Sequence, residues 1–148
     1  MQPVISKHEY RAPADILELE SERLGQPKPI EAIVVSTAPL IGTWLNCDHE
    51  TRGLLRVMIE ASGNEVTLHG FGACSPTPCD WGTVSGKVYA DNVTSVPSVA
   101  FTAVYTFSFK QTTIIGHLFN AALIVETFDH FTDNSGRADY YSQYVMTK

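Results

Sequence analysis

Hydrophobic and polar positions alternate along the chain from residue 41 to the C-terminus. Val, Ile, Phe, Tyr and Thr are frequent in short segments, and Gly, Asn, Asp, Ser or Pro lies close to the end of most of them. This pattern is typical of β-strands that end in turns. It predicts eight strands, at residues 41–46, 53–61, 65–73, 81–90, 99–109, 112–119, 122–131 and 139–147.

The connections between these segments are too short for a crossover helix. Consecutive strands must therefore pair antiparallel. Eight such strands without a helix to cover a face are expected to close on themselves. We predict an all-β fold, an eight-stranded antiparallel up-and-down barrel over residues 41–148. A two-sheet sandwich is the alternative.

Residues 1–40 read as an N-terminal extension with a different pattern. Segment 14–25 predicts one short helix, because Pro13 suits its first turn, acidic residues suit its N-terminal end and Gly25 suits its stop. The apolar run at 31–35 is compatible with a short extra strand.

Turns fix the register of a hairpin and therefore the faces of its strands. A two-residue turn at Gly63-Asn64 places the apolar residues of the second and third strands on one face. That face, which we interpret as the interior, holds Leu55, Val57, Ile59, Ala61, Val66, Leu68, Gly70 and Gly72. The opposite face carries Arg56, Glu60, Glu65 and His69.

Turns at 110–111 and 120–121 define the interior of the next three strands. It holds Phe101, Ala103, Tyr105, Phe107, Phe109, Ile114, Gly116, Leu118, Leu123, Val125, Thr127, Asp129 and Phe131. His117, Glu126 and His130 then project outward, so we interpret them as surface residues and not as a catalytic group.

Asp129 is the ionisable carboxylate of this aromatic inner face. Apolar surroundings would raise its pKa. Alternatively it lies wet at the rim or pairs with an arginine such as Arg137. The small inner residues Gly70, Gly72, Ala103 and Gly116, with Gly82 and Gly86 as further possibilities, favour an unfilled cavity in the lumen.

Alternate loops of an up-and-down barrel share one end. Polar and reactive residues therefore gather at one mouth: Cys47, Asp48, His49, Cys74, Cys79, Asp80, Asp133 and Arg137. The cysteines allow a zinc site together with His49, a Cys74–Cys79 disulfide, or a cysteine nucleophile with His49 as its base. The interpretation that we favour is a stiff, proline-rich lip without chemistry of its own, and we expect no metal.

Composition limits the possible partners. The chain has 148 residues, 44% of them hydrophobic, and a formal net charge of −6. A single globular domain is expected, and the acidic balance argues against nucleic acid. An N-terminal signal pattern and a membrane-length apolar run are both missing from the sequence. We therefore expect a soluble cytoplasmic protein with reduced thiols and no membrane partner.

Two short stretches resemble known families. Gly42-Thr43-Trp44 resembles the G-x-W start of lipocalins, and Trp44-Leu45-Asn46 resembles the first strand of avidins. Both are calycin-like barrels, so the resemblance implies a small molecule held in the lumen, and in avidins the asparagine matching Asn46 contacts the ligand.

CSPTPCDWG and FTDNSGRADY resemble motifs of a group of uncharacterised bacterial barrels. Some calycin-like barrels of natural-product pathways are cyclases, which implies a possible enzyme by analogy of fold.

Three functions follow as hypotheses. The first is a barrel that binds a hydrophobic or polycyclic small molecule through Asn46, Trp81, Tyr105, Phe107, Phe109, Asp129, Phe131, Tyr140 and Tyr144. The second is a cofactor-free cyclase or isomerase in the same cavity, with Asp129 as acid or base and Tyr105 as a hydrogen-bond donor. The third is a homo-oligomeric assembly module that uses the outward Ile115, Phe119 and Ile124.

Overall fold

The computed structural model describes residues 32–148, and residues 33–148 form one compact unit. The helix predicted at 14–25 lies outside the described residues. The eight strands are β1 (Gly42–Asn46), β2 (Leu54–Ser62), β3 (Glu65–Gly72), β4 (Cys79–Ala90), β5 (Ser98–Thr106), β6 (Lys110–Phe119), β7 (Ala122–Phe131) and β8 (Tyr140–Thr147). Each begins and ends within three residues of its predicted bounds.

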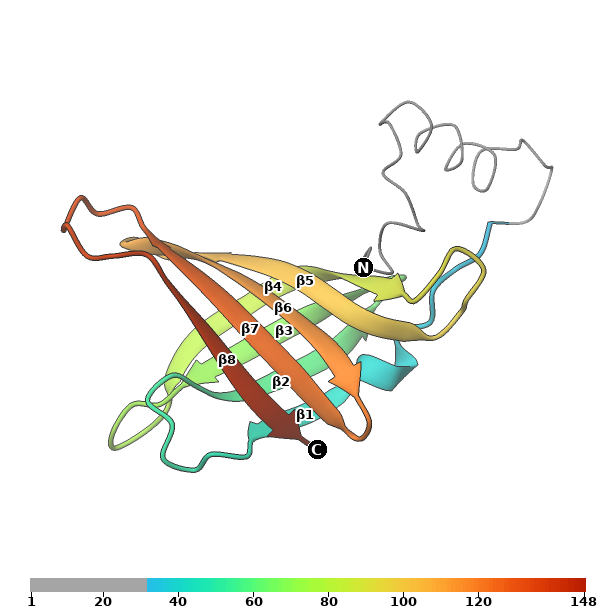
Figure 1. The fold of residues 1–148 in the computed structure, drawn as a ribbon, viewed down its shortest axis with the longest axis horizontal. Coiled ribbons are helices and arrows are strands. Elements are labelled where there is room, and N and C mark those ends of the chain that lie inside the picture. Colours follow the sequence, from blue (N-terminus) through green and yellow to red (C-terminus); the bar gives the residue numbers. More distant parts are fainter. Residues whose placement is uncertain (1–31) are drawn as a thin grey trace, which may run out of the picture. The chain divides into compact units, whose positions relative to one another are not determined.

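The strands form a closed antiparallel barrel in the order β1-β2-β3-β4-β5-β6-β7-β8 (Figure 1). Every strand pairs with its neighbour in sequence, and β8 returns to β1. This confirms the predicted barrel and excludes the sandwich. Among the described residues, no helix has the length and hydrophobicity needed to cross a membrane.

Two of the three predicted turns are confirmed. Ser62 pairs with Glu65 around the two-residue turn at 63–64, and Phe119 pairs with Ala122 around the turn at 120–121. Asn120 has a φ of 55°, a left-handed conformation that asparagine tolerates better than most residues.

The turn predicted at Lys110-Gln111 is wrong. The β5–β6 hairpin closes earlier, because Thr106 pairs with Gln111 and the Phe107 N–H donates to the Lys110 carbonyl at 2.8 Å. Relative to the prediction, each β5 residue pairs with a β6 residue an even number of positions earlier. The same β6 residues therefore still face the interior. Its consequence is local, since Lys110 begins a strand instead of lying in a turn.

The interior contains most of the residues that alternation assigned to it, but Ala61 and Phe109 are exposed and the assignment on β2 needs a correction. The buried hydrophobic side chains are Leu40, Trp44, Leu54, Val57, Ile59, Val66, Leu68, Phe101, Ala103, Tyr105, Ile114, Leu123, Val125 and Met146. Leu54 is buried and Leu55 is only half-buried. A register irregularity between Leu54 and Arg56 reverses the alternation there.

A bulge in β4 decides which way its first residues face. Gly70 lies opposite both Trp81 and Gly82, and Gly82 has a φ of 81°, which favours glycine. The extra residue lets Trp81 and Val84 both pack against the core, although their numbers differ in parity. The facing of β4, which turns could not fix from the sequence, therefore depends on this bulge.

A 3-10 turn, Ala38–Leu40, contributes to the core beside β1. Leu40 is fully buried, and its carbonyl accepts a hydrogen bond of 2.9 Å from the Trp44 indole N–H. The extra strand expected at 31–35 does not form over its described residues, 32–35. An isolated parallel bridge joins Ser36 to Pro97 instead.

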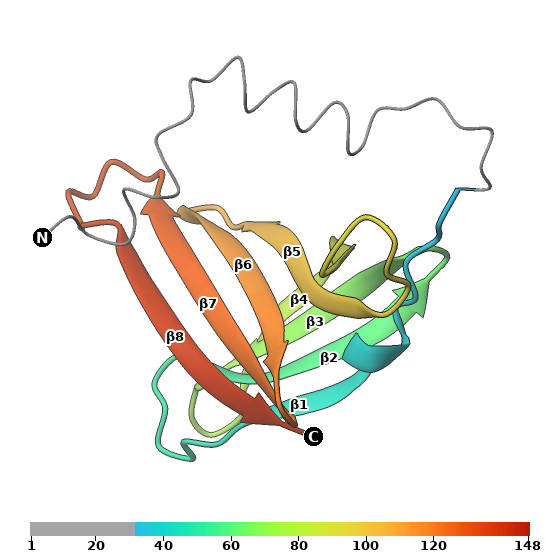
Figure 2. The same cartoon turned by 45° about the vertical axis from the view of Figure 1, so that its right-hand side comes forward.

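The contact between β8 and β1 is the shortest seam of the barrel. It consists of two pairs, Leu45 with Thr147 and Asn46 with Met146. Figure 2 shows the first half of β8 diverging from β1. The β1–β2 loop, not a strand, therefore lies beside the middle of β8.

Candidate functional site

Most of the lumen is filled, contrary to the expectation that its glycines leave a cavity along it. A Cβ at Gly116 would collide with the Phe101 ring, and a Cβ at Gly86 would lie 2.7 Å from a Leu68 methyl carbon. At Gly72 a Cβ would lie 2.8 Å from the Trp81 indole nitrogen. The glycines therefore make room for large neighbouring side chains instead of leaving open volume.

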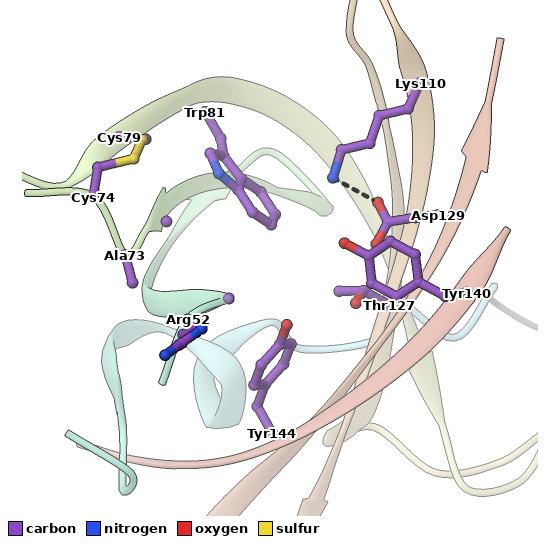
Figure 3. Close-up of a pocket in the computed structure, with 12 residues that line it drawn as sticks. Arg52, Ala73, Cys74, Cys79, Trp81, Lys110, Thr127, Asp129, Tyr140 and Tyr144 are labelled. Carbon is purple, nitrogen blue, oxygen red and sulfur yellow. Dashed lines mark ion pairs between the residues drawn. A yellow bond between two sulfur atoms is a disulfide. The ribbon is translucent and has the colours of Figure 1, made fainter. Parts of the chain in front are cut away.

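A cavity of about 190 Å³ lies at the mouth predicted from loop parity (Figure 3). Its walls come from the β1–β2 loop, the adjoining ends of β3 and β4 with the lip between them, and the inner faces of β6, β7 and β8. Twelve residues line it: Arg52, Gly53, Gly72, Ala73, Cys74, Cys79, Trp81, Lys110, Thr127, Asp129, Tyr140 and Tyr144.

Asp129 is the buried polar centre of this cavity. Strand register places it between Thr112 of β6 and Tyr140 of β8 on the inner face. Its side chain is 5% exposed, accepts a hydrogen bond from the Thr112 hydroxyl and forms an ion pair of 2.9 Å with the Lys110 ammonium. The pairing alternative is therefore correct in kind, but the partner is Lys110. The expected Arg137 pairs with Asp133 at 2.6 Å instead.

Lys110 lies in an aromatic environment. Its ammonium nitrogen is 5.9 Å from the ring centroid of Trp81 and 5.7 Å from those of Phe107 and Phe109. Cation–π attraction at such distances adds to the ion pair with Asp129. The lysine is 14% exposed, so its charge is fixed at the cavity wall instead of extending into solvent.

Trp81 and the two tyrosines supply the flat walls. The Trp81 ring meets Tyr105 edge-on at 5.5 Å and covers the glycines of β3. Tyr144 packs so closely on Gly53 that any side chain there would collide with its hydroxyl. Burial, then the nearby Asp129 carboxylate, raises the pKa of Tyr140. In Figure 3 the side chains of Trp81, Tyr140 and Tyr144 face the same space.

Two contacts of the Asp80 side chain, on the outer side of β4, support the orientation of Trp81. The Asp80 carboxylate accepts from the Gly82 N–H at 2.7 Å and lies 2.6 Å from the His69 imidazole. Both contacts lower the pKa of Asp80, with the Gly82 hydrogen bond as the larger cause. Asp80 thus holds the bulge that turns its neighbour inward.

Two predicted site residues use their polar groups for the fold. The Tyr105 hydroxyl accepts from the Gly70 N–H at 2.9 Å and lies within hydrogen-bond distance of the Leu68 and Gly82 carbonyls. The Asn46 side chain donates to the Leu54 carbonyl and accepts from the backbone N–H of Asp48 in the β1–β2 loop. Neither residue lines the cavity.

The three phenylalanines of the predicted site also lie outside the cavity wall. Phe107 stacks on Tyr105 at 5.5 Å, and Phe109 is 40% exposed at the rim. Arg137 lies over Phe131, 4.2 Å from its ring centroid, and 5.7 Å from that of Phe109. These rings surround the mouth and shield Lys110, while Trp81, Tyr140 and Tyr144 touch the open volume.

Cys74 and Cys79 form a disulfide at the cavity lip, which corrects the expectation of reduced thiols for this pair. The strand ends bring their Cα atoms to 5.3 Å, within the range that a disulfide requires. Cys47 is an exposed free thiol. Within residues 32–148, no three His, Cys, Asp or Glu side chains are grouped to hold a metal ion.

Other predicted surface residues lie on the outer face. His117 and His130 are exposed and Glu126, half-buried, accepts a hydrogen bond from the Tyr141 hydroxyl. Phe119 of the assembly hypothesis is 62% exposed. A second hollow, of about 340 Å³, runs over the outer face near Phe128 and Tyr141. The inner cavity is the better candidate because it is more enclosed and contains the buried Lys110–Asp129 ion pair.

Two charged cavity residues were missed by sequence reasoning. Lys110 was assigned to a turn, and a two-residue shift of that turn would have placed it on the inner face beside Asp129. Arg52 lies in the β1–β2 loop, and no sequence signal distinguishes it from the other polar residues there.

The chain was also compared with known proteins. No family model matches it, and no curated protein or solved structure matches it at a significant level. The function must therefore be argued from the cavity itself.

Proposed function

We propose that this barrel binds one compact small molecule in the mouth cavity. The observation that carries the proposal is the convergence of Trp81, Tyr140 and Tyr144 with the Lys110–Asp129 ion pair around about 190 Å³ of open volume. Apolar walls with a few fixed polar groups are the usual composition of small-molecule sites. A calycin-like role, holding a ligand inside a barrel, agrees with this arrangement.

The cavity volume restricts the ligand. A volume of 190 Å³ equals that of about six liquid water molecules, and a dry cavity of about 150 Å³ can hold benzene. Sites for drug-sized ligands are larger, about 300–1,000 Å³. We therefore propose a ligand with a single ring, or an aliphatic body of similar size, in place of the polycyclic molecule that the sequence suggested.

The binding proposal is tested by NMR with a library of single-ring compounds. The indole N–H signal of Trp81 reports on the cavity, whereas that of Trp44, which is hydrogen-bonded to the Leu40 carbonyl and does not line the cavity, serves as an internal control. We expect binders to shift the Trp81 signal. Ala73→Phe should block this by filling the cavity, and Thr77→Phe, in the same lip but outside the cavity wall, should not.

A library that leaves the Trp81 signal unmoved would contradict the proposal. So would compounds that bind Ala73→Phe as tightly as the natural chain. Circular dichroism and thermal unfolding of both variants separate a blocked cavity from a lost fold.

The Asp129 geometry favours a second candidate, a cofactor-free isomerase or cyclase in the same cavity. A buried carboxylate with a lysine at 2.9 Å and a tyrosine as its register partner is an arrangement suited to proton transfer. With a genuine substrate, Asp129→Asn should abolish turnover while binding persists. Full turnover by Asp129→Asn would exclude this candidate and leave the binding proposal intact.

A further inference from the structure

The charged groups of the cavity indicate the chemical class of the ligand in addition to its size. Two cationic side chains, Arg52 and Lys110, line the cavity with a single carboxylate, that of Asp129. This carboxylate contacts the Lys110 ammonium and the Thr112 hydroxyl through its Oδ1 oxygen. The lining therefore holds one excess positive charge, although the whole chain has a formal net charge of −6.

Arg52 is the source of this excess. The four ion pairs within residues 32–148 do not involve Arg52. By contrast, Arg137, in the β7–β8 loop at the same end of the barrel, forms an ion pair of 2.6 Å with Asp133. An arginine at a cavity wall that has no carboxylate partner among the described residues is suited to bind an anion, because its planar guanidinium can donate two parallel hydrogen bonds to a carboxylate.

The remaining polar groups of the cavity wall also favour an anionic ligand that accepts hydrogen bonds. The Trp81 indole N–H is a donor only, and the tyrosine hydroxyls at 140 and 144 can donate. Asp129 supplies the single carboxylate of the lining, and Lys110 and Thr112 both contact its Oδ1 oxygen. A wall rich in donors and poor in free acceptors favours a ligand whose polar group accepts hydrogen bonds.

The positions of the lining side chains in Figure 3 indicate how such a ligand would be oriented. Arg52 lies on the loop side of the cavity, and the Lys110–Asp129 pair lies across from it, with the Trp81 and Tyr144 rings facing the space between. A carboxylate at the guanidinium would direct the body of the molecule between these rings. The volume of about 190 Å³ leaves room for one ring beyond the carboxylate.

From these contacts we infer that the ligand is a compact carboxylic acid, bound as its anion by Arg52, with its ring or chain between Trp81 and Tyr144. This inference rests on the proposed binding function and adds the chemical class of the ligand. The single excess positive charge matches the single negative charge of a monocarboxylate.

Benzoate and its neutral isostere benzamide test the inference in the full-length chain, with the Trp81 indole signal as readout. We expect benzoate to bind about tenfold more tightly than benzamide, the size of effect that one charge-assisted contact gives. Arg52→Gln should weaken benzoate about tenfold and leave benzamide within about twofold, whereas Arg52→Lys should retain part of the preference. Sodium chloride at about 1 M should reduce the preference by screening.

Arg137→Gln is the matched control, because it removes the same charge from the same end of the barrel outside the cavity wall. It should leave both affinities within about twofold. Equal binding of benzoate and benzamide, or equal losses in the two arginine variants, would overturn the carboxylate inference while the binding function stands. Failure of both probes to shift Trp81 would overturn both.

Discussion

Removing the Tyr105 hydroxyl tests the conclusion that this group stabilises the fold instead of acting in the site. The side chain is 2% exposed, and its oxygen accepts from the Gly70 N–H at 2.9 Å. Its single proton is available to the carbonyl of Gly82 at 3.0 Å or of Leu68 at 3.2 Å. In Tyr105→Phe the ring remains, but a buried backbone N–H loses its acceptor.

The magnitude follows from that unsatisfied donor. Leaving a buried polar group without a partner costs about 1–3 kcal/mol, and the carbonyls lose one further bond of about 1 kcal/mol. We therefore expect Tyr105→Phe to lower the free energy of unfolding by about 2–4 kcal/mol. Urea denaturation measures this, and an unchanged m-value shows that the folded and unfolded states keep their exposed surface.

Tyr89→Phe is the matched control for this experiment. Tyr89 lies on β4, is 45% exposed and bonds the exposed Thr102 hydroxyl at 3.0 Å. Its loss should change the free energy of unfolding by no more than about 0.5 kcal/mol. Equal effects of Tyr105→Phe and Tyr89→Phe would refute the structural role of the inner hydroxyl.

The same variant gives a pH signature. Burial raises the pKa of Tyr105 from 10.0 to about 12. Between these values the folded chain keeps the phenol proton that the unfolded chain loses, so the stabilisation is complete below pH 10 and declines as pH rises toward about 12. The stability difference between the natural chain and Tyr105→Phe should shrink over that window. A difference that stays constant from pH 9 to about 12 would contradict the burial of the hydroxyl.

Three other changes test the packing and the lip. Gly116→Ala should lower the free energy of unfolding by about 1–3 kcal/mol, since the new Cβ collides with Phe101, and Phe101→Leu in the same chain should recover part of the loss. Replacing Cys74 and Cys79 by serine should lower the free energy of unfolding by about 2 kcal/mol, which is the closure entropy of a six-residue loop. Alkylation of the natural chain without reductant should label a single thiol, that of Cys47. The lowered pKa of Asp80 predicts a stability contribution that is present above pH 3.8 and is lost as pH falls below it. In Asp80→Asn the free energy of unfolding should therefore fall less steeply with decreasing pH in this acid range. The same acid dependence in the variant and the natural chain would contradict this prediction.

The sequence by itself determined the barrel. Alternation located all eight strands, and short connections required antiparallel neighbours. Two-residue turns then fixed the inner faces, so the sequence alone predicted that Asp129 faces inward and His117 outward, and the burial of these residues agrees. These features depend on period-two geometry and chain connectivity, which are local properties of a sequence.

Only the tertiary structure decided the content of the lumen and the composition of the site. Whether Gly116 leaves a void depends on the Phe101 ring of the neighbouring strand, and the direction of Trp81 depends on a bulge at Gly82. The partner of Asp129 was set by a two-residue shift of one turn, which brought Lys110 within 2.9 Å.

The site was less predictable than the fold for a physical reason. Strand register repeats along a sheet, so a shifted turn changes few inner positions as long as parity is kept. A binding site depends instead on side chains from loops and strands distant in sequence, such as Arg52 and Tyr144, whose meeting requires the closed barrel. Alternation therefore specifies the walls of the barrel, while their three-dimensional closure specifies what the cavity can bind.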